Sequence, residues 1–372
     1  MTRLATLFDD FGQSPWIDNI RRDWLEDGTL ASLVASGARG VTSNPAIFAK
    51  AFATSSAYDG LLAKAHSQDP EVVFESLASA DVRDACDVLA PLHAQSRADF
   101  AARRRRYSDG FVSLEVSPRL ARDTQGTIAA AKKLWSQVDR SNVMIKIPAT
   151  REGLPAITAV LAEGINVNVT LIFSLERYGE VLDAWTAGLE AAHRAGRPLE
   201  DIASVASFFV SRVDAAVDAM LPEGDVLRGR IANAQVASAY ELYLERTATA
   251  RVVDLLDLGA QVQRPLWAST SPKNPAYDDL IYVNSIVADE TVNTMPDATL
   301  AAALDHGSFQ ESLLASPASL AATASLLDLL PASVSLAEVT RRLEDEGVAA
   351  FESSYEELLG IVSSKLSGKQ VS

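Results

Sequence analysis

The chain has 372 residues and a formal net charge of −16, and its 48% hydrophobic content is typical of a globular protein, so wholesale disorder is excluded. A surface this acidic repels phosphate backbones, and no apolar run approaches the ~20 residues of a membrane span, so we expect neither a nucleic-acid partner nor a membrane association. Cys86 is the only cysteine, which excludes an internal disulfide and suits a cytoplasmic location.

Short strand-like segments alternate with longer segments rich in Ala and Leu. The predicted strands are residues 15–19, 40–45, 111–116, 143–148, 165–173, 202–210, 264–269 and 280–287. Two of the intervening segments carry clear helix signals, because residues 123–138 begin at the capping residue Asp123 and residues 174–195 begin at Ser174. Regular alternation of strand and helix predicts a parallel sheet.

Eight such units predict a (β/α)₈ TIM barrel, which forms a single domain over residues 1–372. Two connections, at about 46–110 and 211–263, are too long for one helix and should each hold several helices. The segment from about 297 to 366 carries no strand signal, and we expect it to form helices packed outside the barrel.

The strand at 165–173 places polar residues on one face. Asn166, Asn168 and Thr170 alternate with apolar residues, so the apolar face suits the helix layer and the polar face should point into the barrel. Buried polar groups are unfavourable unless they form hydrogen bonds or contact a ligand. We interpret the polar face as part of a binding site, and the alternative is a satisfied amide network.

A lysine lies in the middle of another apolar strand. Lys146 in VMIKIP (143–148) is unusual because lysine is almost never fully buried without a partner. Burial favours the neutral amine, which is a nucleophile and forms a Schiff base with a ketone. Glu115, at the C-terminal end of its strand, lies where such barrels hold their catalytic groups. A structural Lys146–Glu115 ion pair is the alternative.

Other features favour simpler interpretations. The basic run Arg103–Arg106 is typical of a solvated helix end. The four scattered histidines (His66, His93, His193 and His306) lack metal-ligand spacing, so no metal site is predicted. There is also no Gly-x-Gly-x-x-Gly or Walker-type loop to bind a nucleotide.

Five segments together resemble transaldolases, in particular their longer bacterial form, from about Trp16 to Gly307. They are GVTSNP (40–45), SLEVSP (113–118), IKIPAT (145–150), GINVNVTLIFS (164–174) and ASFFVSR (206–212). The resemblance implies a class I aldolase barrel that transfers a dihydroxyacetone unit from sedoheptulose 7-phosphate to glyceraldehyde 3-phosphate in the non-oxidative pentose phosphate pathway. It implies sugar-phosphate substrates, a monomer or homodimer, and no cofactor, since the lysine itself is the electron sink.

The resemblance also implies roles for individual residues. Lys146 matches the Schiff-base lysine, Glu115 and Thr170 match the pair that holds a catalytic water, and Asp18 matches the aspartate that accepts the C4 hydroxyl proton. The matching substrate-binding residues are Asn44 and Asn168 for the dihydroxyacetone hydroxyls, and Ser207, Arg212 and Ser269 for the phosphate.

One position departs from the family pattern. The shorter transaldolases have an arginine where this chain has Ser271, and Lys273 nearby could supply the missing charge. A fructose 6-phosphate aldolase is the nearest alternative enzyme, but those chains are much shorter and use a tyrosine in place of the glutamate. A catalytically silent sugar-phosphate binder is the alternative from another class, and it would have no need of a buried amine.

Overall fold

The computed structural model describes residues 2–368 and contains a curled parallel sheet of seven strands in the order β1-β7-β6-β5-β4-β3-β2. The strands are β1 (Ser14–Ile17), β2 (Val112–Glu115), β3 (Val143–Pro148), β4 (Val167–Ile172), β5 (Ser204–Phe209), β6 (Gln263–Ala268) and β7 (Val292–Met295). Every strand residue except Glu115 is buried as a whole, and the side chain of Glu115 is buried too, as expected for a parallel sheet that packs on both faces.

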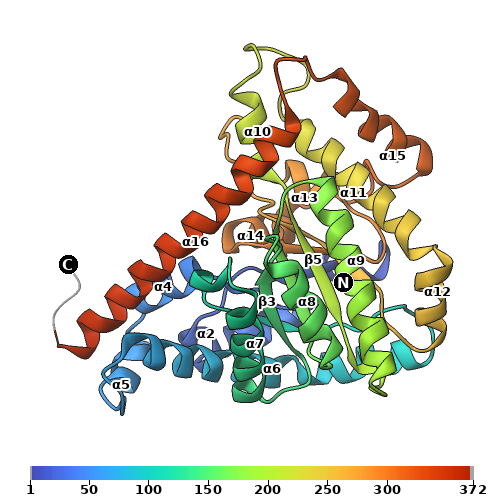
Figure 1. Ribbon diagram of the computed structural model, residues 1–372. Coiled ribbons are helices and arrows are strands. Elements are labelled where there is room, and N and C mark those ends of the chain that lie inside the picture. Colours follow the sequence, from blue (N-terminus) through green and yellow to red (C-terminus); the bar gives the residue numbers. More distant parts are fainter. Residues whose placement is uncertain (1, 369–372) are drawn as a thin grey trace.

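Helices surround the sheet and follow its strands (Figure 1). They are α1 (Arg3–Asp9), α2 (Arg22–Glu26), α3 (Thr29–Ala35), α4 (Pro45–Thr54), α5 (Asp59–Leu62), α6 (Pro70–Ala101), α7 (Thr124–Val138), α8 (Gly153–Ala162), α9 (Leu175–Arg194), α10 (Ser211–Asp218), α11 (Ile231–Thr247), α12 (Ala250–Asp257), α13 (Ile281–Ser285), α14 (Asp297–His306), α15 (Pro317–Ala324) and α16 (Leu336–Leu366). Short 3₁₀ turns are η1 (Ser56–Tyr58), η2 (Pro118–Leu120), η3 (Leu199–Asp201) and η4 (Ser325–Leu329).

The two helices with clear sequence signals begin where the capping residues predict. The side chain of Asp123 accepts a hydrogen bond from the backbone of Gly126 at the start of α7. The side chain of Ser174 accepts one from Arg177 at the start of α9. In both helices the cap satisfies a backbone donor that has no partner inside the helix.

The prediction of a strand at 280–287 is wrong. This segment contains the short helix α13, which buries Tyr282 and Val283, and the seventh strand follows it as β7. A short apolar run suits a buried helix as well as a buried strand, and periodicity alone does not separate them. Here Tyr282 also donates a hydrogen bond to Asp214 on α10, at 2.8 Å, which the helix places within reach.

The predicted strand at 40–45 is reduced to one bridging residue. Val41 pairs in parallel with Ile17 of β1 and also with Val112 of β2, so this segment contacts both edges of the sheet. The chain then turns away, because the side chain of Asn44 caps α4 and Pro45 occupies its first turn. A proline and a helix cap leave no residues to extend the pairing.

The long connections and the C-terminal segment are helical. Helices α4 to α6 cover the connection predicted at 46–110, with α4 beginning one residue before it, helices α10 to α12 lie within 211–263, and α14 to α16 follow β7. The last of these, α16, packs against α4, α6 and α10 (Figure 1). No helix within residues 2–368 is both long and apolar enough to cross a membrane.

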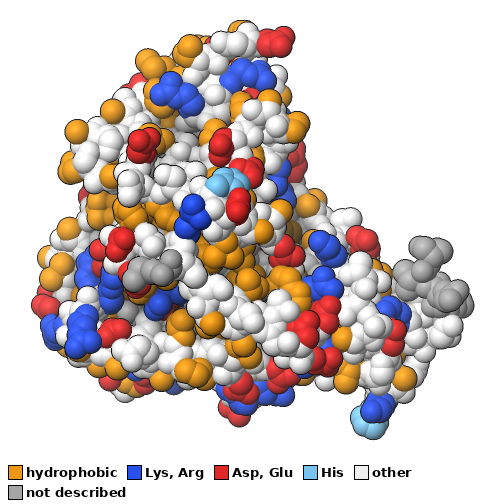
Figure 2. All heavy atoms as spheres, turned by 180° about the vertical axis from the view of Figure 1, so that it is seen from behind, with side chains coloured by type: hydrophobic (Ala, Val, Ile, Leu, Met, Phe, Trp, Pro, Cys, Tyr) orange, Lys and Arg blue, Asp and Glu red, His pale blue; other side chains and the backbone are white. Residues whose placement is uncertain are grey.

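Charged side chains of both signs are spread over the face shown in Figure 2, and apolar atoms are exposed in the hollow between its upper and lower parts. Acidic residues outnumber basic ones by 49 to 33 in the whole chain. Any site for an anionic ligand therefore needs a local concentration of cations.

Candidate active site

The C-terminal ends of the parallel strands bring the predicted catalytic residues together. Asp18 follows β1, Glu115 ends β2, Lys146 lies on β3 and Thr170 on β4. Strand register places Glu115 beside Lys146, and Lys146 beside Asn168 of β4. Three residues from three strands thus form one row across the sheet, which their spacing in the sequence does not reveal.

Lys146 is buried and paired. Its Nζ donates hydrogen bonds to Oε2 of Glu115 and to the backbone oxygen of Ser43, both at 3.1 Å. The side chains of Lys146 and Glu115 are only 6% and 5% exposed. The predicted ion pair therefore exists, and by itself it is compatible with both a structural and a catalytic lysine. The ring of Phe351 on α16 covers Nζ, with 5.4 Å between Nζ and the ring centroid.

The pKa of the Glu115 carboxyl group is raised toward neutral pH. Burial raises its pKa to about 6, while the neighbouring ammonium of Lys146 works in the opposite direction and the charge of Asp18 adds to the rise. A carboxyl group with a pKa near 6 can both accept and donate a proton close to physiological pH. This property suits proton transfer better than a purely structural role.

Asp18 belongs to the same electrostatic cluster. Burial raises its pKa, whereas the charge of Lys146 and a hydrogen bond from Thr42 lower it. The hydroxyl of Thr42 donates to Oδ1 of Asp18 at 2.7 Å. Because the charge of Lys146 acts on both carboxyl groups, the three residues share one partly desolvated space.

The polar face of β4 divides into two parts. The amide of Asn166 is fully used by the backbone oxygens of Ser141 and Val143 and by the backbone N–H of Ala203, so for this residue the satisfied network is confirmed. Asn168 donates to the hydroxyl of Ser113 at 3.0 Å and accepts from Ser207 at 2.7 Å.

The hydroxyl oxygen of Thr170 is buried and has no hydrogen-bond partner among the described residues. A buried hydroxyl is rarely left unsatisfied. Thr170 is also one strand away from Lys146, since its register partner is Pro148 of β3. Its hydroxyl is therefore free to bind a water or a substrate group beside the lysine.

Asn44 has a structural contact of its own. Its Oδ1 accepts the backbone N–H of Ile47 at 3.0 Å and so caps α4. Its Nδ2 donates no hydrogen bond to any group within residues 2–368, so the amide nitrogen remains available to donate to a ligand hydroxyl. The cap also fixes the direction of this side chain, because Oδ1 is held by the helix.

Two cations lie close together beyond β5 and β6. Burial lowers the pKa of Arg212, at the start of α10, and burial followed by the charge of Arg212 lowers the pKa of Lys273. Neither side chain forms an ion pair with a carboxylate within the described part of the chain. Nearby, the hydroxyls of Ser211 and Ser269 are 3.0 Å apart. The charge of Arg212 acts on Lys273, so the two cations lie close enough to concentrate positive charge at this end of the sheet.

The residues predicted to bind the phosphate lie in two different places. Arg212, Ser269 and Lys273 lie on the segments that follow β5 and β6, whereas Ser207 lies inside β5 and bonds to Asn168. Ser207 is 1% exposed. Its hydroxyl in this structure supports the amide of Asn168 on the neighbouring strand.

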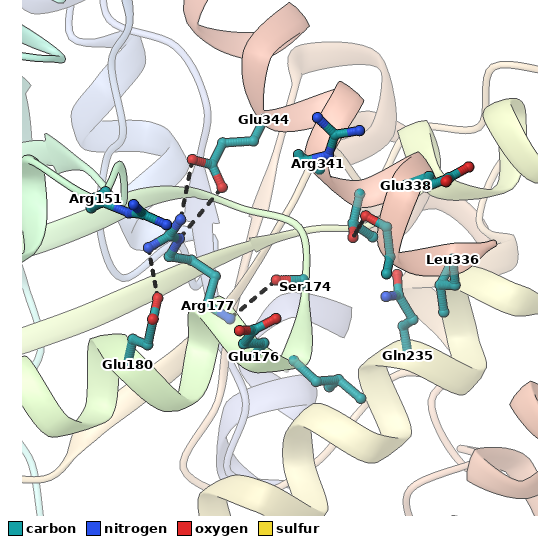
Figure 3. Close-up of a pocket in the computed structure, with 13 residues that line it drawn as sticks. Arg151, Ser174, Glu176, Arg177, Glu180, Gln235, Leu336, Glu338, Arg341 and Glu344 are labelled. Atoms are coloured by element: carbon teal, nitrogen blue, oxygen red, sulfur yellow. Dashed lines mark hydrogen bonds and ion pairs between the residues drawn. The ribbon is translucent and has the colours of Figure 1, made fainter.

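A separate cavity of about 490 Å³ lies between α9, α11 and the first turns of α16 (Figure 3). It does not include Lys146 or Glu115. Among its lining residues, Arg177 is neutralised by Glu180 at 2.6 Å and by Glu344 at 3.4 Å. With four glutamates and three arginines in its wall, this cavity lacks the excess positive charge that a sugar phosphate requires.

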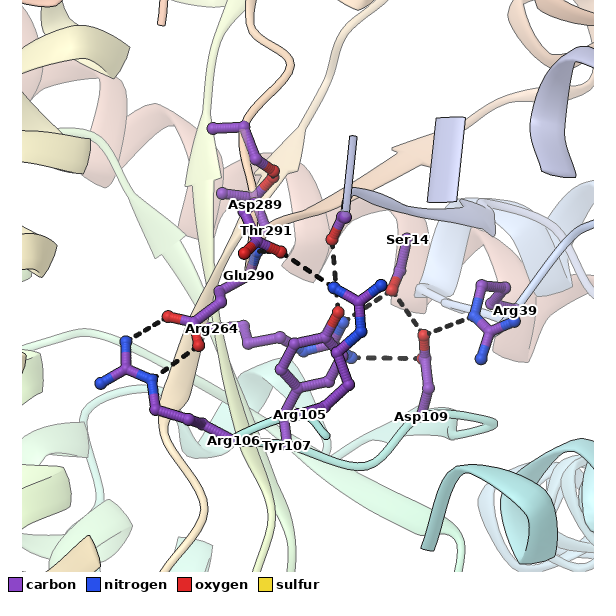
Figure 4. Close-up of polar contacts among 12 residues, drawn as sticks. Ser14, Arg39, Arg105, Arg106, Tyr107, Asp109, Arg264, Asp289, Glu290 and Thr291 are labelled. Atoms are coloured by element: carbon purple, nitrogen blue, oxygen red, sulfur yellow. Dashed lines mark hydrogen bonds and ion pairs between the residues drawn. The ribbon is translucent and has the colours of Figure 1, made fainter. Parts of the chain in front are cut away.

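The opposite end of the sheet holds a second buried polar cluster (Figure 4). Asp109 accepts hydrogen bonds from Ser14, Trp16, Arg39 and Arg264. Ser14 and Arg264 lie in the first two residues of their strands and Arg39 lies in the loop before Val41, whereas Trp16 lies within β1. In parallel α/β sheets, ligands bind at the carboxyl ends of the strands, which is the other end of this sheet, so we assign this cluster to stability.

Several residues that shape the site were missed at the level of sequence. Thr42 and Ser43 belong to the GVTSNP segment, and their polar side chains in a predicted strand could have assigned them to the site. Ser113 lies two residues before Glu115 and so shares its face of β2, and its polar side chain was a similar indication. Phe351 carried none, because only the fold brings α16 over Lys146. No group of three or more potential metal ligands is found within residues 2–368.

Comparisons with known proteins identify the family of the chain. The sequence profile of the family described as "Transaldolase/Fructose-6-phosphate aldolase" matches residues 15–362. The chain is 50% identical to a protein named Transaldolase from Thermobifida fusca (strain YX) over 365 residues, or 96% of both chains. It is 47% identical to a Transaldolase of Mycolicibacterium smegmatis (strain ATCC 700084 / mc(2)155) over 364 residues, or 95% of both chains.

Proposed function

Because the chain belongs to the transaldolase/fructose-6-phosphate aldolase family, we propose that it is a transaldolase of the non-oxidative pentose phosphate pathway. It transfers a dihydroxyacetone unit from sedoheptulose 7-phosphate to glyceraldehyde 3-phosphate, which gives erythrose 4-phosphate and fructose 6-phosphate. The observation that carries the proposal is the buried amine of Lys146 beside Glu115 and Asp18.

Lys146 is the proposed nucleophile. The neutral amine attacks the C2 carbonyl of the ketose, and loss of water gives an iminium ion that acts as an electron sink. Asp18 removes the C4 hydroxyl proton, the C3–C4 bond breaks, and its electron pair moves into the iminium to form an enamine on Lys146. The aldose phosphate leaves, and the enamine attacks the aldehyde carbon of the acceptor. Hydrolysis of the new iminium restores the lysine.

Glu115 and Thr170 are the proposed proton-transfer pair. The carboxyl group of Glu115, with its pKa near 6, exchanges protons through a water held by the unpartnered hydroxyl of Thr170. In this arrangement the 3.1 Å contact between Glu115 and Lys146 allows the amine to lose its proton before it attacks the substrate.

The amides of Asn44 and Asn168 are proposed to bind the hydroxyls of the dihydroxyacetone unit. Asn168 lies beside Lys146 in the strand register, and Asn44 has a free Nδ2. Both side chains are oriented by other contacts, Asn168 by Ser207 and Asn44 by the helix that it caps. Oriented groups bind substrate hydroxyls without a further loss of side-chain entropy.

Arg212, Lys273 and Ser269 are proposed to bind the phosphate, with Ser207 contributing from within β5. The Arg212 guanidinium can hold two phosphate oxygens, and Lys273 adds a point charge in place of the family's arginine, at whose position Ser271 stands. Neither cation has a carboxylate partner within residues 2–368, which supports this assignment.

The proposed architecture is a complete (β/α)₈ barrel in one domain that spans residues 1–372. The bridges of Val41 to β1 and to β2 support the segment around residue 41 as a reduced eighth strand that closes the seven-stranded sheet. The helices at 46–110 and 211–263 are then insertions into this barrel, and those at 297–366 are an extension. We further propose a cytoplasmic monomer or homodimer.

The direct test is to trap the intermediate. The enzyme is treated with fructose 6-phosphate and borohydride, and the modified peptide is identified by mass spectrometry. A reduced three-carbon adduct is expected on Lys146. An adduct on Lys132, Lys133 or Lys273 would refute the assignment of the nucleophile.

A further inference from the structure

We propose that Phe351 is a specificity-determining residue: its ring seals Lys146 from water, so that the three-carbon enamine is transferred to an aldose instead of being released. This inference rests on the proposed Schiff-base role of Lys146. It concerns a residue in the C-terminal extension, outside the segments that carry the family resemblance.

The position of Phe351 follows from the close approach of α16 to the end of β4. At Gly347 a Cβ atom would lie 3.1 Å from Cδ2 of Leu171 and 3.4 Å from the ring of Phe173, so the helix backbone approaches these side chains as closely as a glycine permits without their moving. Phe351 is one helical turn further along the same face. The small residue therefore lets the helix place the next side chain over Lys146.

The contact between the ring and the amine is buried. Nζ of Lys146 lies 5.4 Å from the centroid of Phe351, which is within the range of a cation–π interaction. Phe351 is 8% exposed and the Lys146 side chain 6% exposed. The ring thus stabilises the cationic iminium that forms on the lysine, and it occupies space that water would otherwise fill.

Ion pairs hold α16 from two sides. Glu344 pairs with Arg177 of α9 at 3.4 Å, as seen in Figure 3. Asp345 pairs with Arg122 at 2.9 Å, and Glu356 pairs with Arg119 of η2 at 2.6 Å. Each exposed pair contributes little alone, but together they come from different segments and define the register of the helix around Phe351.

The chemical consequence concerns the enamine that remains on Lys146 after the first aldose has left. In transfer, its C3 carbon attacks the acceptor aldehyde. In the side reaction, the same carbon takes a proton from water, and the resulting iminium adds water and breaks its C–N bond. This restores the amine and releases dihydroxyacetone. The net side reaction converts fructose 6-phosphate into dihydroxyacetone and glyceraldehyde 3-phosphate, without any oxidant or further reactant.

Both steps of the side reaction need water at Lys146, whereas transfer does not until the new bond has formed. Excluding water therefore favours transfer over release. Glu115 and Thr170 can hold one catalytic water on the sheet side, while Phe351 closes the side of α16.

The test uses the full-length enzyme and the variants Phe351→Ala and Phe351→Leu. Release of dihydroxyacetone from fructose 6-phosphate alone is followed by its enzymatic reduction with NADH. Transfer is measured with erythrose 4-phosphate as the acceptor. We expect Phe351→Ala to raise the ratio of release to transfer by about tenfold or more, because water gains access to the lysine. Phe351→Leu retains most of the volume and should raise the ratio less.

Leu343→Ala is the matched control, because it removes a buried side chain of the same helix without touching Phe351. An equal increase of the ratio in this variant would show that loosening of α16 is the cause and would overturn the proposal. A ratio of release to transfer in Phe351→Ala that stays within about twofold of the parent enzyme would also overturn the proposal. If Phe351→Ala does not fold, Phe351→Val is judged by the same thresholds.

Borohydride trapping separates the two levels of the argument. A normal adduct on Lys146 in the parent enzyme and in Phe351→Ala, with an unchanged ratio, would refute only the role of Phe351. A missing adduct in the parent enzyme would refute the Schiff-base assignment and with it this inference.

Discussion

Replacing Asp109 by Asn should destabilise the fold without changing the chemistry of the site. Asp109 is completely buried and accepts hydrogen bonds from Arg39 at 3.0 Å and Arg264 at 3.2 Å (Figure 4), and also from Trp16 at 2.9 Å. Asn is nearly the same size, so the variant removes the negative charge and leaves the packing almost unchanged.

The size of the effect follows from the two arginines. The side chain of Arg39 is 18% exposed, so water compensates part of its loss, whereas that of Arg264 is only 2% exposed. Removing one partner of a buried ion pair costs about 3–5 kcal/mol, because the other charge stays behind. We expect the lower end, about 3 kcal/mol, for Asp109→Asn, since its Oδ1 can still accept hydrogen bonds.

The charge state of Asp109 supports a measurement at neutral pH. Burial alone would raise the pKa of Asp109, but the charges of Arg264 and Arg39 outweigh it and hold the pKa below the usual value. A carboxyl group with a lowered pKa stabilises the fold fully above its unfolded-state pKa, and this stabilisation is lost as the pH falls through the folded-state pKa. At pH 7 the whole contribution is present.

Urea unfolding followed by tryptophan fluorescence and by circular dichroism gives the free energy of unfolding. A double-mutant cycle with Arg264→Met isolates the ion pair. In the Arg264→Met background, Asp109→Asn should cost less by about 2 kcal/mol, because the more deeply buried charge of Arg264 is absent and only the partly exposed Arg39 loses its partner. An equal cost in both backgrounds, or a cost below about 1 kcal/mol for Asp109→Asn alone, would show that the reasoning is wrong. The rate per folded enzyme should stay the same.

Two further predictions concern the site. Arg212→Ala should weaken the use of fructose 6-phosphate by about 2–4 kcal/mol in kcat/KM, with a smaller loss for Lys273→Ala and little change toward an unphosphorylated ketose; equal losses on both substrates would contradict the phosphate assignment. As the pH falls through about 6, protonation of Glu115 should lower kcat/KM, and Glu115→Gln should abolish this acid limb and reduce the rate by about 10²-fold or more. A limb that persists in Glu115→Gln belongs to another group.

Most of the candidate site could be read from residue types in strands. Lys146, Glu115 and Asn168 were recognisable because burying a charged or amide side chain in an apolar strand is unfavourable unless the group has a partner or a ligand. Their adjacency, however, is a matter of register, which places them in one row across β2, β3 and β4. Nothing in the local sequence specifies which residue of one strand faces which residue of the next.

The incorrect prediction of a strand at 280–287 shows the same limit of local sequence information. Helix α13 and strand β7 are both short, and their assignment depends on tertiary contacts such as the bond from Tyr282 to Asp214. A run of about five residues has too few local interactions to select its own conformation.

The sequence by itself determined the alternation of strands and helices, the starts of α7 and α9, and the residue types that could perform Schiff-base chemistry. These features depend on local periodicity, helix caps and side-chain chemistry, which act over a few residues. Only the tertiary structure decided that Asn166 and Asn168 have different partners and that Val41 contacts both edges of the sheet. It alone placed Phe351 over Lys146, because a contact between residues about 200 positions apart depends on how α16 packs across the finished sheet.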